Sequence, residues 1–147
     1  MEVYGFDTNI EAIERAERTI GKRKADDFSN FDVYIICIST HAPEDMFPPN
    51  IEGVLSTAET ISKEAKKDGA LVSIESTITK GTSRKVSEIL GHRLHVTHAP
   101  NRWYALEEQE HGVNQLRVIG GVFDCCLRAG MELYTGVTGS DDTFYIR

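Results

Sequence analysis

Short apolar runs and longer amphipathic stretches alternate along this chain. The runs "FDVYIICIS" and "ALVSIEST" are typical of strands buried on both faces, and "HVTHAP" and "LRVIGG" predict two more strands. The opening "EVYGFD" is a shorter strand-forming run that ends in an acid, and Thr8 and Glu11 then have the spacing of a helix capping box. Because strands alternate with helices, the expected fold is α/β, an open and mostly parallel sheet with helices on both faces.

Three later stretches have the spacing of helices. The first is capped by Asn50 and stopped by Gly69, and its apolar face is Ile51, Val54, Leu55, Ala58, Ile61 and Ala65. The second, in "KGTSRKVSEILG", ends before Gly91 and presents Val86, Ile89 and Leu90 on one face. The third begins near Val122 and is expected to bury Val122, Cys125, Cys126, Ala129 and Leu133. Residues 1–136 are therefore expected to form one domain, followed by a loose polar tail over 137–147.

Composition narrows the class of partners. The chain has 147 residues, a net charge of -7 and 40% hydrophobic residues, which suits one globular domain and disfavours nucleic-acid binding. The short basic clusters "GKRK" and "KEAKK" are interleaved with acids and predict solvated faces. No apolar run has the length of a membrane span, and three cysteines form no disulfide framework. We expect a cytoplasmic protein with no membrane partner.

Candidate chemistry lies where the predicted strands end. In open α/β sheets, ligands bind at the carboxyl ends of the strands. The residues at those ends are Asp7, Ser39 with Thr40, the "ESTITKGT" segment from Glu75, and "APNRW" from Ala99. Small hydroxyl residues there leave room for a planar ligand and offer it hydrogen-bond donors. The alternative is that Ser and Thr only end strands and cap helices, as they commonly do.

The histidines and cysteines do not predict a metal site. His92, His95 and His98 are three apart, and residues three apart on a strand point to opposite faces. Cys125 and Cys126 fall on the apolar stripe of the last predicted helix, where free cysteine behaves as a small hydrophobe. We therefore expect these two cysteines to pack in the core.

In this order, "VYGFD", "VYIICIST", "LVSIESTITKGT", "HVTHAPNRW" and "LRVIGG" resemble one family. They look like the NAD-binding domain of the UDP-glucose/GDP-mannose dehydrogenases, most of all the UDP-N-acetylmannosamine dehydrogenase branch. The resemblance covers almost all of residues 3–134, and "IESTITKGT" is its most specific piece. It implies a Rossmann-like fold, NAD as cofactor, and oxidation of a UDP-sugar such as UDP-N-acetylmannosamine or UDP-glucose to the uronic acid.

The resemblance also implies roles for particular residues. Asp7 matches the acid that binds the adenosine ribose and favours NAD over NADP, although it could instead be a simple helix-cap acid. Ser39 and Thr40 match the strand end beside the nicotinamide half of the cofactor. Thr77 matches the threonine that positions cofactor and catalytic water, with a turn hydroxyl as the alternative. On the substrate side, Asn101 and Arg102, after Pro100, match the turn that approaches the sugar.

Departures from the family pattern limit what the chain is expected to do alone. Asn101 stands where the family turn carries a glutamate, and an amide cannot act as a general base. Glu107, Glu108 and Glu110 could substitute, or could form a solvated acidic loop. The family's nucleophilic cysteine and catalytic lysine match no residue here and are expected beyond residue 147. An alternative to an oxidoreductase fragment is a non-catalytic nucleotide-binding or subunit-interaction module.

The phosphate loop is the most consequential departure. No G-x-G-x-x-G occurs in the 147 residues, although in the family it precedes the acid matched by Asp7. In the strand order 3-2-1-4-5-6, the first strand lies between the strand of Asp7 and "VYIICIS", so both are expected to present unpaired edges. These edges could pair directly, or a homo-oligomer or strand-pairing dimer could cover them, or the chain could be a fragment. Each case predicts weakened NAD affinity.

Overall fold

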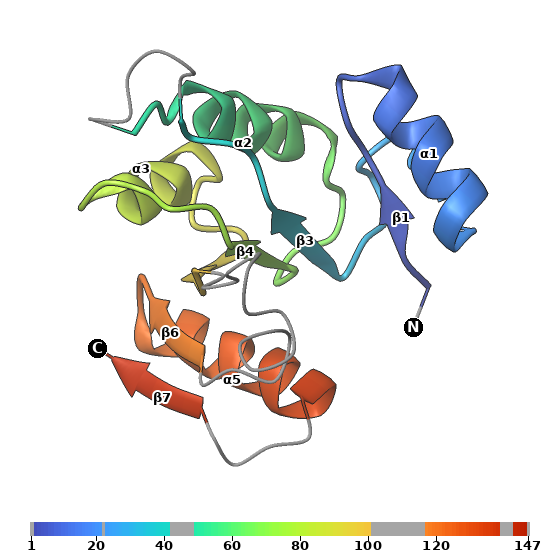
Figure 1. Cartoon of the computed structure of the whole chain (residues 1–147). Coiled ribbons are helices and arrows are strands. Elements are labelled where there is room, and N and C mark those ends of the chain that lie inside the picture. Colours follow the sequence, from blue (N-terminus) through green and yellow to red (C-terminus); the bar gives the residue numbers. More distant parts are fainter. Residues whose placement is uncertain (1, 22, 42–48, 101–116, 139–142, 147) are drawn as a thin grey trace.

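The computed structural model describes residues 2–21, 23–41, 49–100, 117–138 and 143–146. In chain order the elements are β1 (Tyr4–Gly5), α1 (Ile10–Ile20), β2 (Arg23–Lys24), β3 (Val33–Ile36), α2 (Glu52–Glu64), β4 (Leu71–Ile74), α3 (Thr82–Ile89), β5 (His95–His98), β6 (Arg117–Gly121), α5 (Asp124–Thr138) and β7 (Thr143–Ile146). They form a two-stranded sheet, β1-β2, and a five-stranded sheet, β3-β4-β5-β6-β7, here called the main sheet. Figure 1 shows α2 and α3 above the strands β3 and β4 of the main sheet and α5 below these strands. The α/β fold expected from the sequence is confirmed.

Strand direction in the main sheet is mostly parallel. β3, β4 and β5 pair in parallel, β5 and β6 are antiparallel, and β6 and β7 are again parallel. The loose tail predicted for residues 137–147 is corrected in two ways, since α5 extends to Thr138 and β7 pairs with β6. The "TFYI" of β7 consists of strand-forming residue types, but four residues are too few to show a period.

The core lies between the main sheet and the helices above it. All four residues of β4 are buried, as expected for a central strand covered on both faces. α2 contributes Val54, Ala58 and Ile61, which have the predicted helical spacing. Asn50 accepts a hydrogen bond from the Glu52 N–H at 2.9 Å, so it assists the start of α2 although Ile51 is the residue at the cap position.

Of the two glycines predicted to end helices, Gly91 does so and Gly69 does not. Gly91 lies just past α3 with a φ of 64°, a left-handed conformation that favours glycine. Gly69 does not end α2, because α2 ends at Glu64 and Ala65 is its C-cap residue. Gly69 instead has a φ of 77° in the turn that leads into β4.

The buried face of α5 differs from the prediction by one residue. Its buried positions are Cys126, Gly130 and Tyr134, spaced four apart. Cys125 is exposed, which corrects the expectation that both cysteines lie in the core. The reason is a close approach at Gly130, where an added Cβ would lie 2.6 Å from Thr97 Cγ2 of β5. Glycine and tyrosine add little to an apolar pattern, so the sequence pattern places the stripe on the neighbouring Ala129 and Leu133.

Residues 2–25, here called the N-terminal unit, contain β1, α1 and β2. β1 and β2 pair in parallel around α1, so the basic "GKRK" predicted to be a solvated face supplies an exposed strand. The capping box predicted from Thr8 is wrong, because Asn9 is the N-cap and accepts a hydrogen bond from the Glu11 N–H at 2.9 Å. Throughout the part of the chain described here, no helix is both long and apolar enough to cross a membrane.

Candidate functional site

The carboxyl ends of β3, β4 and β5 lie at one level of the main sheet. Ile36, Ile74 and His98 are register partners across the three strands. The ladder continues one residue further, since the Glu75 N–H donates to the Ile36 carbonyl at 2.9 Å and the Ala99 N–H donates to the Ile74 carbonyl at 3.0 Å. The segments after these strands therefore leave the sheet side by side, as the sequence predicted. We call this edge the strand-end site.

Ser76 holds the strand-end site together. Its hydroxyl donates to the Ile38 carbonyl at 2.7 Å, and its own carbonyl lies 3.2 Å from His98 Nε2. One residue of β4's continuation thereby contacts the chain after β3 and the last residue of β5. Burial lowers the pKa of His98, and the hydrogen bond to the Ser76 backbone partly offsets that effect. The sequence pointed to its neighbour Thr77 but not to Ser76, whose only signal is its place in the "EST" segment.

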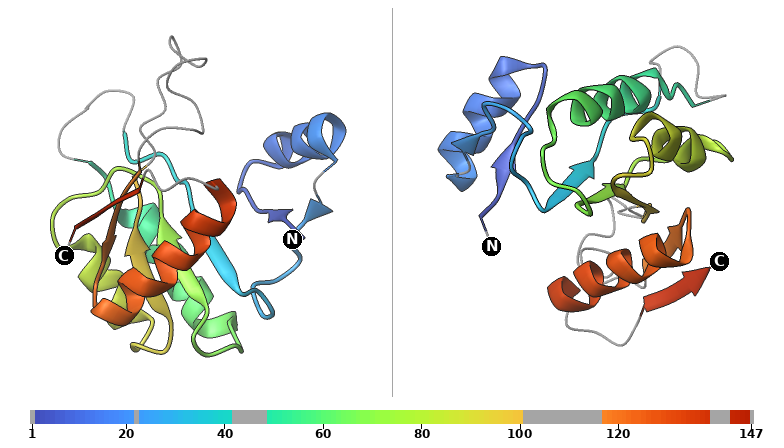
Figure 2. Two further views of the ribbon diagram at one scale, coloured as in Figure 1. Left: turned by 90° about the horizontal axis from the view of Figure 1, so that it is seen from below. Right: turned by 180° about the vertical axis from the view of Figure 1, so that it is seen from behind.

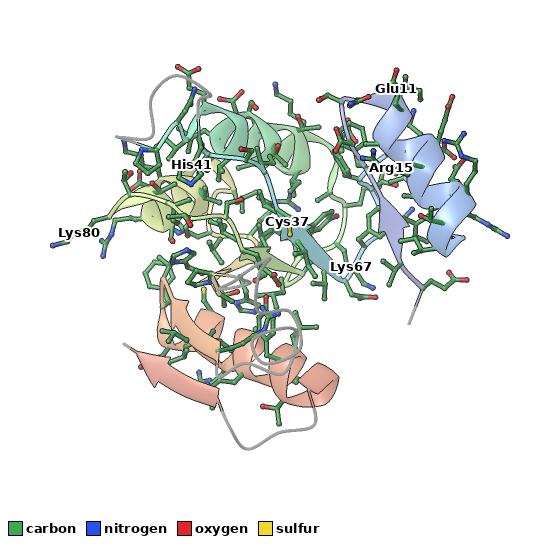
Figure 3. The ribbon with its side chains drawn as sticks, in the orientation of Figure 1. Glu11, Arg15, Cys37, His41, Lys67 and Lys80 are labelled. Carbon is green, nitrogen blue, oxygen red and sulfur yellow. The ribbon has the colours of Figure 1, made fainter. Side chains whose placement is uncertain are left out.

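The hydroxyl residues predicted to line the site divide by exposure. Ser39 and Thr77 are exposed, whereas Thr40 is 3% exposed and its carbonyl accepts from the Asn50 N–H at 2.8 Å. Thr40 is thus part of the packing beneath the site. Figure 3 shows Cys37 at the end of β3 in the middle of the view, with His41 and Lys80 further to the left near α3. The segment from Cys37 to His41 therefore crosses from the end of β3 towards α3, and Ser39 lies on this path.

A buried polar network lies under the end of β4. The Tyr134 hydroxyl donates to Glu75 Oε1 at 2.7 Å and lies 2.7 Å from the Ser73 hydroxyl. Arg117 Nη1 lies 3.4 Å from Glu75 Oε2, and its guanidinium carbon stands 5.1 Å from the centre of the Tyr134 ring. Burial raises the pKa of Tyr134. Of this network the sequence pointed only to Glu75, because Ser73 lies inside the buried strand β4 and the other two members, Arg117 and Tyr134, come from β6 and α5, far away in the chain.

Arg117 compensates the charge of Glu75 at close range. The side chains are 14% and 11% exposed, so this ion pair is shielded from water, unlike the pairs on the surface of the molecule. Arg117 Nη1 is nevertheless buried without a hydrogen-bond partner, although it lies within ion-pair distance. A cation from the antiparallel strand β6 therefore lies beside the carboxylate at the end of β4.

Asp7 lies at the carboxyl end of β1 and is exposed. Its Oδ1 accepts a hydrogen bond from the Asn9 N–H at 2.8 Å, which forms the turn before α1. Since Asn9 is the N-cap, Asp7 is not the helix-cap acid that was its alternative interpretation. Its contact with ribose stays a prediction. Asn101, Arg102, Glu107, Glu108 and Glu110 lie outside the described residues.

A gap separates the N-terminal unit from the main sheet. Among the described residues β1 pairs only with β2, and β3 pairs only with β4, so the direct pairing of "EVYGFD" with "VYIICIS" does not occur. Figures 1 and 2 show β1 and β3 as neighbours in different sheets. Aromatic contacts connect the two units at the edge of the gap, with ring centroids of Tyr4 and Phe31 at 5.7 Å and of Phe6 and Phe28 at 5.0 Å.

Comparison with known proteins agrees with this architecture. Residues 5–138 match the model of the UDP-glucose/GDP-mannose dehydrogenase family, NAD binding domain. The chain belongs to this family. A UDP-N-acetyl-D-mannosamine dehydrogenase from Methanococcus maripaludis is 34% identical over 106 residues, which cover 70% of this chain and 25% of the relative. One from Pyrococcus horikoshii is 31% identical over 128 residues, which cover 79% and 30%.

Solved structures of the family share the fold. The UDP-N-acetyl-mannosamine dehydrogenase Cap5O from Staphylococcus aureus matches with a TM-score of 0.77 and 22% identity, over 99% of this chain and 42% of that one. The Pyrococcus horikoshii enzyme matches with a TM-score of 0.70 and 24% identity, over 98% and 37%. The chain thus spans between a quarter and a third of the curated relatives named above, and it is a nucleotide-sugar dehydrogenase NAD-binding domain.

Proposed function

We propose that this domain binds the adenosine ribose and the nicotinamide of NAD in an enzyme that oxidises a UDP-sugar. UDP-N-acetylmannosamine is the first candidate for that sugar. The observation that carries the proposal is the strand-end site, where Ser39 and Thr77 present exposed side chains beside the register-matched ends of β3 and β4. The sugar is inferred from the relatives, which are UDP-N-acetyl-D-mannosamine dehydrogenases. NAD would supply the acceptor for a hydride removed from the sugar alcohol.

The residues present fit the two ends of the cofactor, the adenosine ribose and the nicotinamide, but not the pyrophosphate between them. The exposed Asp7 carboxylate would accept hydrogen bonds from both ribose hydroxyls, and its charge would repel the 2′-phosphate of NADP. Ser39 and Thr77 would face the nicotinamide half, and Asn101 with Arg102 would approach the sugar. No glycine-rich cradle for the pyrophosphate occurs in the 147 residues.

The gap between β1 and β3 is where we place the missing cradle. Figure 1 shows β1 of the two-stranded sheet next to β3 of the main sheet, so β2-β1, one vacant position and β3-β4-β5 would correspond to the dinucleotide-binding order 3-2-1-4-5-6. A parallel strand in that position would pair with both edges and would direct the glycine loop after it towards the strand-end site. The partner that we propose is therefore a strand–glycine loop–helix segment.

The experiment compares the chain with a chimera. In the chimera, the first strand, glycine loop and helix of the Methanococcus maripaludis relative are fused ahead of Glu2. Calorimetric titration should show NAD binding by the chimera that is at least tenfold tighter than that of the chain alone. Asp7→Ala should abolish the preference for NAD over NADP, whereas Glu17→Ala, which removes an exposed acid on α1, should not. A folded chimera that fails to bind NAD would refute the proposal.

Activity gives a second test. Residues 1–147 alone should produce no NADH with UDP-N-acetylmannosamine or UDP-glucose, because no residue here matches the nucleophilic cysteine or the catalytic lysine of the family. Steady NADH production by the purified chain would contradict this assignment. The assay needs a full-length relative as positive control, so that a failure of the substrate is not mistaken for inactivity of the chain.

A non-catalytic interaction module is the second candidate, and one observation favours it. Four large apolar side chains near the gap are exposed by 38–57%: Val3, Tyr4, Phe6 and Ile35. Exposed apolar residues beside unpaired strand edges favour strand pairing with a second molecule. Light scattering should then show a dimer that the chimera converts to a monomer, because its added strand occupies the same edges. A dimer that persists in the chimera would place the interface elsewhere.

A further inference from the structure

Two adjacent cysteines and a histidine converge on the face of the main sheet that α5 covers. His95 is the first residue of β5, and Cys125 and Cys126 lie in the first turn of α5. The ligand atoms of these three residues all lie within 4.8 Å of one another. The spacing of the histidines and the apolar stripe of the cysteines do not reveal this convergence, because it depends on α5 packing its first turn beside His95.

The packing of α5 against β5 fixes this juxtaposition. Gly121 has no space for a side chain, since an added Cβ would lie 2.3 Å from the backbone nitrogen of Leu127. The Val122 N–H donates to the Val96 carbonyl at 3.2 Å, which ties the segment before α5 to the residue after His95. On the strand side, the His95 N–H donates to the Ala70 carbonyl at 2.9 Å. Both halves of the cluster are therefore held by backbone contacts that do not depend on a ligand.

The chemistry of the three side chains selects a class of ligand. Two thiolates and an imidazole form a borderline-soft donor set, which suits a d10 cation such as Zn²⁺ better than Mg²⁺ or Ca²⁺. A tetrahedral zinc with Zn–S of about 2.3 Å separates neighbouring ligand atoms by roughly 3.5–3.8 Å. Since the three ligand atoms here lie within 4.8 Å of one another, side-chain rotations that move them by about 1 Å would suffice.

A disulfide between the two cysteines is not the better explanation. Consecutive Cα atoms are about 3.8 Å apart across a trans peptide, below the roughly 4.4–6.8 Å that disulfides span. The helical first turn of α5 thus keeps Cys125 and Cys126 as a pair of thiols. Cys126 is 2% exposed and burial raises the pKa of its thiol, so a bound cation would have to displace a proton there.

We propose that His95, Cys125 and Cys126 form a Zn²⁺ site with a fourth position open to water on the side of the exposed Cys125. The site joins β5 to the start of α5. His95 begins β5, whereas the strand-end site follows His98 at its other end, so the metal would act on the structure and not on the proposed oxidation chemistry. The inference is independent of NAD binding.

Cobalt binding tests the proposal directly. The reduced, metal-free protein is titrated with Co²⁺, and one equivalent per chain should give a thiolate charge-transfer band together with the strong d–d bands of tetrahedral cobalt. Zn²⁺ should then displace it and should raise the Tm of the protein. An octahedral spectrum without a thiolate band would overturn the proposal.

Matched variants assign the ligands. Cys125→Ser and His95→Asn should each weaken Zn²⁺ affinity by at least about 100-fold, because even partners outside the ligand shell commonly change it about 10–100-fold. Cys37→Ser and His92→Asn should leave the affinity unchanged. Cys126→Ser alters a buried residue and is interpreted only if its fold is intact by circular dichroism. Unchanged binding in Cys125→Ser and His95→Asn, or loss of binding in Cys37→Ser, contradicts the site. All these readouts are made without NAD, so failure of the proposed cofactor role would not affect them.

Discussion

The main sheet and the N-terminal unit have the same kinds of element but bury them very differently. β4 and its neighbours lie between α2 and α3 on one face and α5 on the other, with Val72, Ile74 and Val96 fully buried. The N-terminal unit has strands of two residues each, and only Ile13 and Ala25 are buried within it. Its helix α1 leaves Ile10 and Ile20 exposed by 57% and 65%.

This difference indicates where the domain is complete. A helix covering a two-stranded sheet is too small to bury a core, and two strands alone are marginally stable in water. The N-terminal unit therefore depends on its contacts with the rest of the molecule, which include the ring pairs Tyr4–Phe31 and Phe6–Phe28. A strand in the gap would convert the two sheets into one. The same event would complete the core of the N-terminal unit and, under the proposed function, the NAD site.

The largest expected effect comes from matched truncations in the two regions. Ile74→Ala in β4 should lower the free energy of unfolding by about 2–5 kcal/mol, because Ile74 is 0% exposed and its truncation leaves a cavity in the core. Ile13→Ala should lower the global value by less than about 1 kcal/mol, since the N-terminal unit should open locally before the whole domain unfolds. Urea denaturation with amide hydrogen exchange measures both. Equal global losses would show that the two regions unfold as one.

A glycine pair on α5 tests the packing of the main sheet. Gly130→Ala should destabilise the domain by about 2–3 kcal/mol, because the new Cβ meets Thr97 at 2.6 Å and Ile119 at 3.2 Å. Gly136→Ala, with nothing within 4 Å of its added Cβ, should stabilise by about 0.5–1 kcal/mol through helix propensity. Thermal denaturation of the two variants should therefore give Tm changes of opposite sign. A stable Gly130→Ala would mean that α5 can move away from β5.

The sequence predicted the strands around β4 well, and it missed β2 of the N-terminal unit and β7 of the main sheet. "ALVSIEST" forms β4, which is buried on both faces as predicted, so hydrophobicity alone identifies it. The same prediction for "VYIICIS" is wrong, because Tyr34 and Ile36 of β3 are buried whereas Ile35 between them is 54% exposed. β2 consists of Arg23 and Lys24, whose pairing depends on backbone hydrogen bonds that leave no apolar pattern. At the site, strand ends predicted Ser39 and Thr77, because parallel strands must end at one edge.

Residues joined by tertiary packing were beyond prediction. Tyr134 is 61 residues from Ser73, and only the position of α5 under β4 brings their hydroxyls to 2.7 Å. The turn of α5 that places Cys126 inside and Cys125 outside depends in the same way on Gly130 meeting Thr97. A helical stripe read from apolar residues alone is therefore uncertain by about one residue wherever glycine or tyrosine forms the buried contact.

Hydroxyl removal in each region is expected to have a smaller effect. Tyr134→Phe should destabilise by about 1–2 kcal/mol, because Ser73 and Glu75 lose a buried partner. Tyr4→Phe in the N-terminal unit removes only an exposed contact of 3.5 Å with Glu2 and should change stability by less than about 0.3 kcal/mol. Urea denaturation of both variants measures the difference. A neutral Tyr134→Phe would indicate that water replaces the hydroxyl and that the network is wetter than its burial indicates.

Acidification should distinguish the two regions by the smallest effect. Burial lowers the pKa of His98, so the folded main sheet favours the neutral imidazole. A group with a lowered folded pKa contributes its stability fully above its unfolded value of about 6.5 and loses it as the pH falls through that value towards the folded pKa. Amide exchange should therefore report weaker protection of β4 and β5 at pH 5.5 than at 7.5. Residues 2–25 contain no histidine, so α1 should not respond in this window. His98→Gln should remove the response from the main sheet, and a response that survives this substitution would have to come from another titrating group.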